Sequence, residues 1–232
     1  NNTPSLDAPG VHTLAGDGGL TRLMLSNAQS VGELYLHGAH MTRWQPRDSQ
    51  PVLWMSDSAV FAPDKAIRGG VPLCWPWFGP HPVDAGAKAH GFARLVEWRL
   101  ASVDQQADTT RLNLQTTSSP GTLALWPHEF ALALEITAGP ALAVALTTHN
   151  TGADPFTITE ALHTYLTVAD IGQVSIEGLH GAAYRDQTRG GAVFTQDGPT
   201  VTFVEETDRV YQTTAGCTLL DPVLGRRIHV EK

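Results

Sequence analysis

Short alternations of apolar and polar residues, separated by turn residues, restrict the fold of this chain more than any other feature. In two neighbouring runs every second residue is large and apolar: Phe130, Leu132, Leu134 and Ile136 in the first, and Leu142, Val144 and Leu146 in the second. A third run begins at Val201. Gly139-Pro140 separates the first two runs, and Asp197-Gly198-Pro199 precedes the third. Such runs are typical of half-buried strands. No stretch of similar length has helical periodicity, and glycine and proline recur too often for long helices. The sequence therefore predicts an antiparallel β-sandwich or barrel.

The 232 residues are enough to bury a substantial core, and all-β chains of this length commonly form one domain. We find no internal repeat, low-complexity tract or linker. We therefore expect residues 1–232 to form a single domain. The formal net charge of -8, with the arginines concentrated in one segment, argues against nucleic acid or an anionic membrane as a partner.

The two cysteines, Cys74 and Cys217, lie far apart and form no CxxC pair. They indicate neither a disulfide framework nor a thiolate zinc site, and they fit a reducing compartment. Prolines and charged residues interrupt the Ala/Leu-rich region 121–146, and no signal-peptide pattern is present. These features predict a cytoplasmic protein that does not span a membrane.

The segment 66–98, AIRGGVPLCWPWFGPHPVDAGAKAHGFARLVEW, concentrates arginines, histidines, aromatic residues, glycines and prolines. Because glycine and proline fix unusual backbone conformations, the segment predicts a rigid, aromatic-lined pocket that carries the guanidinium groups of Arg68 and Arg94. Guanidinium binds phosphate in bidentate fashion and stays charged at working pH. For an arbitrary arginine, a surface ion pair is the commoner arrangement.

His163 is the best candidate for proton transfer. In the segment 156–166, FTITEALHTYL, period-two alternation places Phe156, Ile158 and Leu162 on one face and His163 with Tyr165 on the other. A histidine on the polar face can donate or accept a proton near neutral pH. A structural histidine, hydrogen-bonded within the sheet, fits the same pattern.

Several long motifs also resemble a known family. IRGGVPLCWPWFGPHP followed by AHGFAR resembles the glucose-6-phosphate 1-epimerases, the hexose-6-phosphate branch of the aldose 1-epimerase (mutarotase) family. The likeness continues in LHGAHMTRWQP, LWMSDSAVFAPDKA, EALHTYL, GLHGAAYRD, EETDRVY and DPVLGRRIHVEK. It implies a large antiparallel β-sandwich of the galactose mutarotase-like type. It further implies an isomerase that interconverts the α and β anomers of a hexose 6-phosphate, glucose 6-phosphate first, without metal or organic cofactor.

The resemblance also implies roles for five residues. His163 matches the general acid, and Arg68 and Arg94 match substrate-binding arginines that we expect to hold the 6-phosphate. Asp208 matches an aspartate that binds sugar hydroxyls, a role that suits an acceptor-only carboxylate; without the resemblance, it suggests a turn with a surface ion pair. We place His90 beside the sugar ring, and a loop-holding hydrogen bond is the alternative role.

Two features depart from the family pattern. Ala89 stands where the family often has a glutamine that contacts substrate, so that contact is expected to be lost or replaced. The family's general base is a glutamate beyond a WNPW-type motif, and no residue here matches it; Glu231 precedes its expected place. The chain also begins at Asn1 without a methionine. We therefore expect both ends of the protein, with the last strands of the sandwich, to lie outside this sequence.

His37 and His40 have a spacing that suggests a metal, but no third ligand accompanies them, and we expect a structural role. The sequence distinguishes neither the preferred hexose nor the oligomeric state. Besides the mutarotase, two hypotheses stay open. One is a non-catalytic sugar-phosphate-binding module of the same fold. The other is a mutarotase-like sandwich for unphosphorylated sugar, or a lyase-related carbohydrate domain, which predicts no loss when the arginines are replaced.

Overall fold

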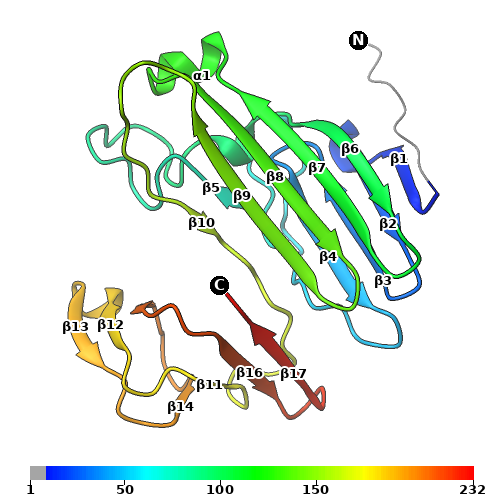
Figure 1. Cartoon of the computed structure of the whole chain (residues 1–232). Coiled ribbons are helices and arrows are strands. Elements are labelled where there is room, and N and C mark those ends of the chain that lie inside the picture. Colours follow the sequence, from blue (N-terminus) through cyan, green and yellow to red (C-terminus); the bar gives the residue numbers. More distant parts are fainter. Residues whose placement is uncertain (1–8) are drawn as a thin grey trace. The chain divides into compact units, whose positions relative to one another are not determined.

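The computed structural model describes residues 9–232, and its ordered elements are almost all β-strands (Figure 1). The helical elements described are short: the α-helix α1 (Pro120–Leu125) and the 3-10 turns η1 (Asp17–Gly19), η2 (Ala93–Leu95) and η3 (Gln187–Arg189). No helix within residues 9–232 is long and apolar enough to cross a membrane. The predicted all-β class is confirmed. The chain folds as two compact units, one up to Leu166 and one from Thr167, and the single-domain expectation stays a prediction.

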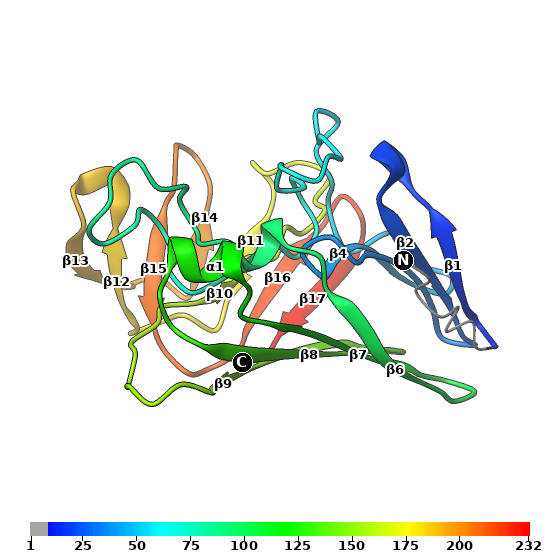
Figure 2. The same ribbon diagram turned by 90° about the horizontal axis from the view of Figure 1, so that it is seen from above.

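Two four-stranded antiparallel sheets of the first unit are each built from strands that are consecutive in the sequence. One has the strands β1 (Val11–Ala15), β2 (Thr21–Ser26), β3 (Ser30–Tyr35) and β4 (His40–Pro46), and the other has β6 (Arg99–Gln105), β7 (Thr110–Thr117), β8 (Phe130–Ala138) and β9 (Leu142–Asn150). The sheet of β6 to β9 forms one layer, which Figure 2 shows edge-on, and β3 of the other sheet contacts β8. The core lies between these layers.

The alternation read from the sequence accounts for β8 and β9. Phe130, Leu132, Leu134 and Ile136 point into the core and are almost fully buried. Gly139-Pro140 makes the turn, after which β9 pairs with β8 along its whole length. On β9, Leu142, Val144 and Leu146 are half-buried while their neighbours are exposed. A period of two thus predicts these strands because opposite faces of the sheet meet core and solvent.

The segment 156–166 is less regular than the sequence predicts. Its only ladder pairing is that of β10 (Ala161–Leu162) with β5 (Leu73–Cys74). Leu162, expected on the buried face, is 37% exposed. The ladder is short because Pro72 and Pro76 flank β5 and have no backbone N–H to donate.

The register of that pairing nevertheless continues on both sides of β5. The backbone N–H of Thr159 donates to the Pro76 carbonyl at 3.1 Å, and that of His163 donates to the Pro72 carbonyl at 3.1 Å. The N–H of Tyr165 donates to the carbonyl of Gly70 at 2.8 Å. On its other side, the N–H of Trp54 donates to the Tyr165 carbonyl at 3.0 Å, so the segment that carries His163 is held by backbone bonds to two neighbouring segments.

The second unit consists of short antiparallel strands. One sheet has the order β14 (Thr200–Thr202), β11 (Ser175–Glu177), β16 (Cys217–Asp221) and β17 (Arg226–Val230), and the other has β13 (Ala192–Thr195), β12 (Ala183–Asp186) and β15 (Arg209–Gln212). Val174, Val201 and Leu219 are buried within it. The strand predicted from Val201 onward is shorter than expected, since Val204 is 90% exposed.

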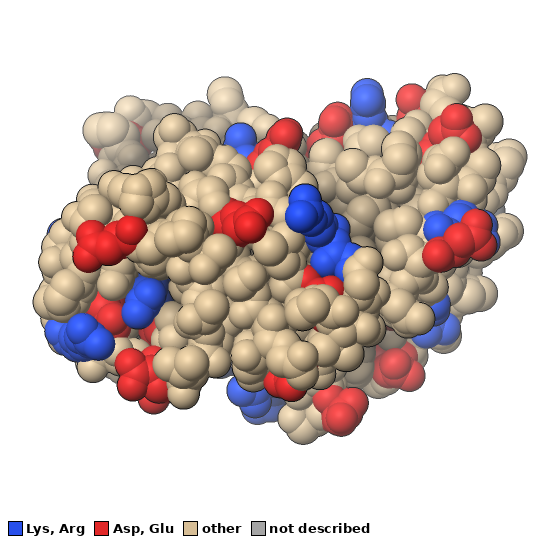
Figure 3. All heavy atoms as spheres, turned by 90° about the horizontal axis from the view of Figure 1, so that it is seen from below, with Lys and Arg blue, Asp and Glu red and all other residues tan. Residues whose placement is uncertain are grey.

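Charged side chains are dispersed over the face of the molecule that Figure 3 shows. Lys and Arg occur there singly or in small groups among Asp and Glu, and most of that surface is uncharged. On this face, neither the basic nor the acidic side chains form a continuous stripe.

Candidate functional site

Five aromatic side chains of the first unit lie in contact and form what we call the ring cluster: Trp54, Phe78, His90, His163 and Tyr165. The ring centroids of His90 and His163 are 6.2 Å apart, and Phe78 lies 5.0 Å from His90 and 6.0 Å from His163. Tyr165 lies 4.8 Å from His163, and Trp54 lies 5.8 Å from Tyr165. Trp54 and Phe78 are each 41% exposed, so the cluster has apolar ring surface open to solvent.

The backbone around His90 fixes its ring and determines which nitrogen carries the proton. The N–H of Gly79 donates to Nδ1 of His90 at 3.1 Å, and the N–H of His90 donates to the Gly79 carbonyl at 2.8 Å. Because Nδ1 accepts, the neutral ring has its proton on Nε2. Burial, aided by the charge of Arg94 and by His163, lowers the pKa of His90 below its usual value. His90 thus holds its loop and keeps an N–H donor free for a ligand.

His163 directly follows β10, and its backbone is held by Pro72. Its Nδ1 is buried and has no hydrogen-bond partner among the residues described. The ring is therefore positioned by the backbone and by ring contacts with Phe78 and Tyr165. The buried Nδ1 cannot reach a ligand; Nε2, which has no hydrogen bond within residues 9–232 and is not among the buried partnerless atoms, is the nitrogen available for proton transfer.

Arg68 lies in a loop whose backbone is tightly held while its side chain is exposed. The carbonyl of Arg68 accepts from the N–H of Ser56 at 3.2 Å. Gly69 and Gly70 follow with φ of 109° and 60°, a region that favours glycine. The Arg68 guanidinium has no hydrogen bond or ion pair within residues 9–232. Arg68 therefore does not form the surface ion pair that is common for arginine, as far as residues 9–232 show.

Arg94 lies in η2 and is half-buried. Its Nη2 donates to the carbonyl of Ala89 at 2.9 Å, and its Nε is buried without a partner in the described part of the chain. Its charge contributes to the lowered pKa values of His40 and His90, so the guanidinium lies close to both. At Ala89, the backbone carbonyl contacts Arg94, whereas the family's glutamine side chain is missing.

Asp208 belongs to the second unit, whereas the other four predicted site residues belong to the first. It precedes β15, and its carbonyl accepts from the N–H of Gln187 at 2.8 Å. Its exposed carboxylate has no partner among residues 9–232. The neighbouring Arg209 pairs with Asp186 instead, at 3.7 Å, so the Asp-Arg turn that the sequence suggested makes its ion pair elsewhere.

The aromatic lining expected from the segment 66–98 is mostly wrong. Trp75, Trp77 and Phe92 are buried and belong to the core. Trp75, for example, packs against Phe130 with ring centroids 4.5 Å apart. These large rings bury more apolar area in the core than they would in an open site. The exposed Trp54 was missed, since a single tryptophan in LWMSDSAVFAPDKA carries no pattern that separates core from site.

His37 and His40 hold carbonyls of the Arg68 loop, as expected for a structural role. Nε2 of His37 lies 2.7 Å from the carbonyl of Lys65, and Nε2 of His40 lies 2.8 Å from that of Gly69. Both rings are buried. Within residues 9–232, no three His, Cys, Asp or Glu side chains gather as metal ligands would.

The stability of the fold is expected to fall between pH 6.5 and pH 4 because of His40. Burial is the main reason that the pKa of His40 drops from 6.5 to about 4. The unfolded chain binds a proton below about pH 6.5, whereas the folded one does so only near pH 4. This group alone should lower the unfolding free energy by about 1.4 kcal/mol per pH unit in that window. Urea unfolding at pH 7 and pH 5 checks this, and His40→Gln should flatten the slope. Parallel profiles for the two proteins would contradict it.

Gly91 is expected to tolerate no side chain. Its φ is 67°, and a Cβ there would overlap the backbone carbonyl of Trp75. Gly91→Ala should cost about 3 kcal/mol of unfolding free energy, measured by urea denaturation. Gly19→Ala is the matched control, since φ is 75° and nothing lies within 4 Å of the added carbon. It should cost about 1 kcal/mol, and equal losses for both variants would refute the steric argument.

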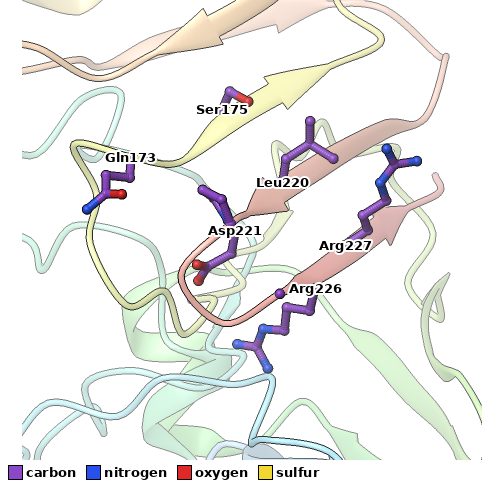
Figure 4. A pocket seen from close by; sticks show the side chains of 8 residues that line it. Gln173, Ser175, Leu220, Asp221, Arg226 and Arg227 are labelled. Carbon is purple, nitrogen blue, oxygen red and sulfur yellow. The ribbon is translucent and has the colours of Figure 1, made fainter.

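The second unit has an open pocket of its own, with a volume of about 370 Å³, which contains none of the predicted site residues. Figure 4 shows its lining, which includes Gln173, Asp221, Arg226 and Arg227. The Asp221 carboxylate accepts the N–H groups of Ala169, Val223 and Leu224, which lowers its pKa although its burial opposes this. This carboxylate therefore has a structural role at the β16–β17 turn.

The first unit thus carries two neighbouring histidines and two arginines without carboxylate partners among the described residues, and comparison with known proteins defines the class. The family model described as aldose 1-epimerase matches residues 21–232. The chain belongs to the aldose 1-epimerase family, whose enzymes interconvert the anomers of sugars. A sugar is thus the class of small-molecule ligand that the family indicates.

Individual relatives agree with this assignment. A protein of Escherichia coli (strain K12), provisionally named a glucose-6-phosphate 1-epimerase, is 38% identical over 212 residues, covering 91% of this chain and 70% of that protein. A crystal structure from Salmonella typhimurium, provisionally described as a mutarotase, has a TM-score of 0.90 at 33% identity and covers 98% of this chain and 76% of that one. A galactose mutarotase-like protein from Clostridium acetobutylicum has a TM-score of 0.73 at 10% identity, covering 94% and 79%, which shows the shared fold alone.

Proposed function

We propose that this protein interconverts the α and β anomers of a D-hexose 6-phosphate, with glucose 6-phosphate as the substrate. The observation that carries the proposal is the pair His90 and His163, 6.2 Å apart, in the same unit as two arginines without carboxylate partners. The names of the relatives support the phosphorylated substrate.

Mutarotation requires an acid and a base on one hemiacetal. The base removes the proton of the anomeric hydroxyl while the acid protonates the ring oxygen; the ring opens to the aldehyde, the C1–C2 bond rotates, and reclosure gives the other anomer. Each positioned proton-transfer group contributes about 10²- to 10⁴-fold. In this proposal His163 is the acid, since Nε2 of its ring has no hydrogen bond within residues 9–232. The base is a glutamate that the resemblance implies, and none of these 232 residues matches it.

The remaining candidate residues bind and orient the substrate. His90 donates from Nε2 to a sugar hydroxyl, because its Nδ1 is occupied by Gly79. Arg68 and Arg94 hold the 6-phosphate through charge-assisted hydrogen bonds. For Asp208, in the second unit, a role as acceptor for sugar hydroxyls rests on the resemblance alone. The exposed rings of Trp54 and Phe78 offer apolar surface for the C–H face of the sugar.

The test is the anomerisation rate of glucose 6-phosphate, measured by NMR exchange spectroscopy on the natural gene product and on the 232-residue chain. Acceleration, together with a much smaller effect on glucose, supports the proposal. Binding of glucose 6-phosphate without acceleration by either protein would instead indicate the sugar-phosphate-binding module. Equal acceleration of glucose and glucose 6-phosphate would indicate an enzyme for unphosphorylated sugar.

We also propose a cytoplasmic location. Both described cysteines, Cys74 and Cys217, are free thiols, which fits a reducing compartment. Fractionation of cells that express the tagged natural protein checks this; recovery of the protein outside the cytoplasmic fraction would contradict it.

A further inference from the structure

Two buried histidines, His37 and His40, have no part in the proposed chemistry, yet both contact the loop that carries Arg68. They lie at either end of the turn that joins β3 to β4, where Gly38 and Ala39 have positive φ. His37 is 3% exposed and His40 is 1% exposed. Placing two imidazoles in a core costs free energy, and simple packing there is better served by apolar side chains.

The two rings contact backbone carbonyls that precede and follow Arg68 in the sequence. His37 contacts the carbonyl of Lys65 and His40 that of Gly69, at 2.7 Å and 2.8 Å. Backbone bonds complete the arrangement: Arg68 accepts from Ser56, and Gly70 donates to the Trp54 carbonyl at 2.7 Å. A carbonyl cannot donate, so in both contacts the histidine Nε2 carries the proton. The backbone of residues 65–70 is thus held from both sides, while the Arg68 guanidinium is left without a partner among the described residues.

Histidine suits this position because it donates a hydrogen bond without adding charge. His40 lies close to Arg94, whose charge opposes protonation of the ring. A lysine or arginine at position 40 would bring a second buried positive charge beside Arg94, which is costly without an anion. The approach is also close: a Cβ on Gly70 would lie 3.0 Å from Nε2 of His40. The His40 ring and the Gly69-Gly70 backbone therefore fit each other.

We propose that His37 and His40 are positioning residues that set the Arg68 guanidinium for the phosphate group of the substrate. This inference rests on the proposed function, since it gives Arg68 the 6-phosphate as its ligand. The two histidines would then determine how strongly the protein prefers a phosphorylated sugar over the same sugar without phosphate. They would not affect binding of the sugar ring itself.

The experiment compares His40→Gln with His40→Leu in the natural gene product. NMR titration gives the affinities for glucose 6-phosphate and for glucose, and their ratio is the readout. A glutamine amide can reach the Gly69 carbonyl as Nε2 does, so His40→Gln should keep the ratio within about threefold. Leucine has similar volume but no donor, and His40→Leu should lower the ratio by about tenfold, because small displacements of a binding group are costly. Affinity for glucose should be unchanged in both.

A double-mutant cycle with Arg68→Ala separates positioning from general damage. If His40 acts through Arg68, adding His40→Leu to Arg68→Ala should cause no further loss of the ratio. Asn27→Leu is the matched control: Asn27 is also buried and donates to the Ala138 carbonyl at 2.9 Å, but it contacts none of the candidate site residues. It should lower the thermal unfolding midpoint without changing the ratio.

The failures of the two proposals are distinguishable. A wild-type protein that does not prefer glucose 6-phosphate over glucose overturns the proposed function, and this inference with it. A clear wild-type preference that survives unchanged in folded His40→Leu overturns the positioning role alone. If His40→Leu does not fold, His37→Leu is compared with His37→Gln, since His37 contacts the Lys65 carbonyl. An unchanged affinity ratio in folded His37→Leu would then overturn the positioning role.

Discussion

Replacing His163 with alanine should lower the rate of glucose 6-phosphate anomerisation by about 10²- to 10⁴-fold, the contribution of one positioned acid. The Nε2 of the ring makes no hydrogen bond within residues 9–232, so the variant loses a proton donor and its ring contacts with Phe78, His90 and Tyr165 but no hydrogen bond of the ring. Its backbone N–H still donates to Pro72 in the variant, and the segment should stay in place. NMR exchange spectroscopy on the natural gene product measures the rate, and affinity for the substrate should change much less than turnover.

His149→Ala provides the matched control for this variant. His149 lies on β9 with an exposed side chain, in the same unit as His163. It should leave the rate unchanged. A folded His163→Ala protein with the wild-type rate would remove His163 from the acid role, and the unassigned proton donor would then have to be sought at His90.

Arg68→Ala should weaken glucose 6-phosphate binding by about 10²-fold and leave glucose binding nearly unchanged. The guanidinium is exposed and has no partner among the described residues, so its removal leaves no unpaired carboxylate in the protein. What is lost is the charge-assisted contact with phosphate, which is about twice as strong as a neutral hydrogen bond. Arg68→Lys should give an intermediate loss, because an ammonium group is a point charge without the planar fork.

Arg111→Ala is the corresponding control for Arg68→Ala. Arg111 is also largely exposed, but its Nε lies 3.7 Å from Glu135 on the neighbouring strand of the β6–β9 sheet. Its removal changes the net charge by the same amount, so any loss of affinity that it shares with Arg68→Ala reports the overall charge. Isothermal titration calorimetry with both sugars gives the comparison. Equal losses for glucose and glucose 6-phosphate would exclude Arg68 as the phosphate ligand.

The regular strands were predictable because one simple rule governs them. In β8, each large apolar side chain meets the core and each neighbour meets a less buried face, so Phe130 to Ile136 read as a strand without further information. The segment 156–166 has the same alternation but little ladder pairing, because the adjacent chain has prolines where donors would be needed. Alternation indicates which face of a strand is buried. The length of its hydrogen-bonded pairing depends also on the donors and acceptors of the neighbouring strand.

The candidate site was predictable only in part. The sequence motifs singled out His90 and His163, and in the structure their rings lie together. The many aromatic residues between 66 and 98 led to the wrong prediction that they line a pocket, because Trp75 and Phe92 are buried in the core. Trp54 joins the ring cluster through a contact with Tyr165, more than a hundred residues along the chain, and local sequence carries no trace of such a contact.

In the first unit, backbone hydrogen bonds hold the segments that carry the candidate side chains, and the Arg68 guanidinium and the Nε2 atoms of His90 and His163 have no hydrogen bond within residues 9–232. Arg68, His90 and His163 are each fixed through main-chain groups, at Ser56, Gly79 and Pro72. A framework of this kind separates the stability of the fold from the choice of ligand. With Arg68 in its proposed role as the phosphate ligand, this residue can be exchanged for one that recognises another substituent on the sugar, with little loss of folding free energy.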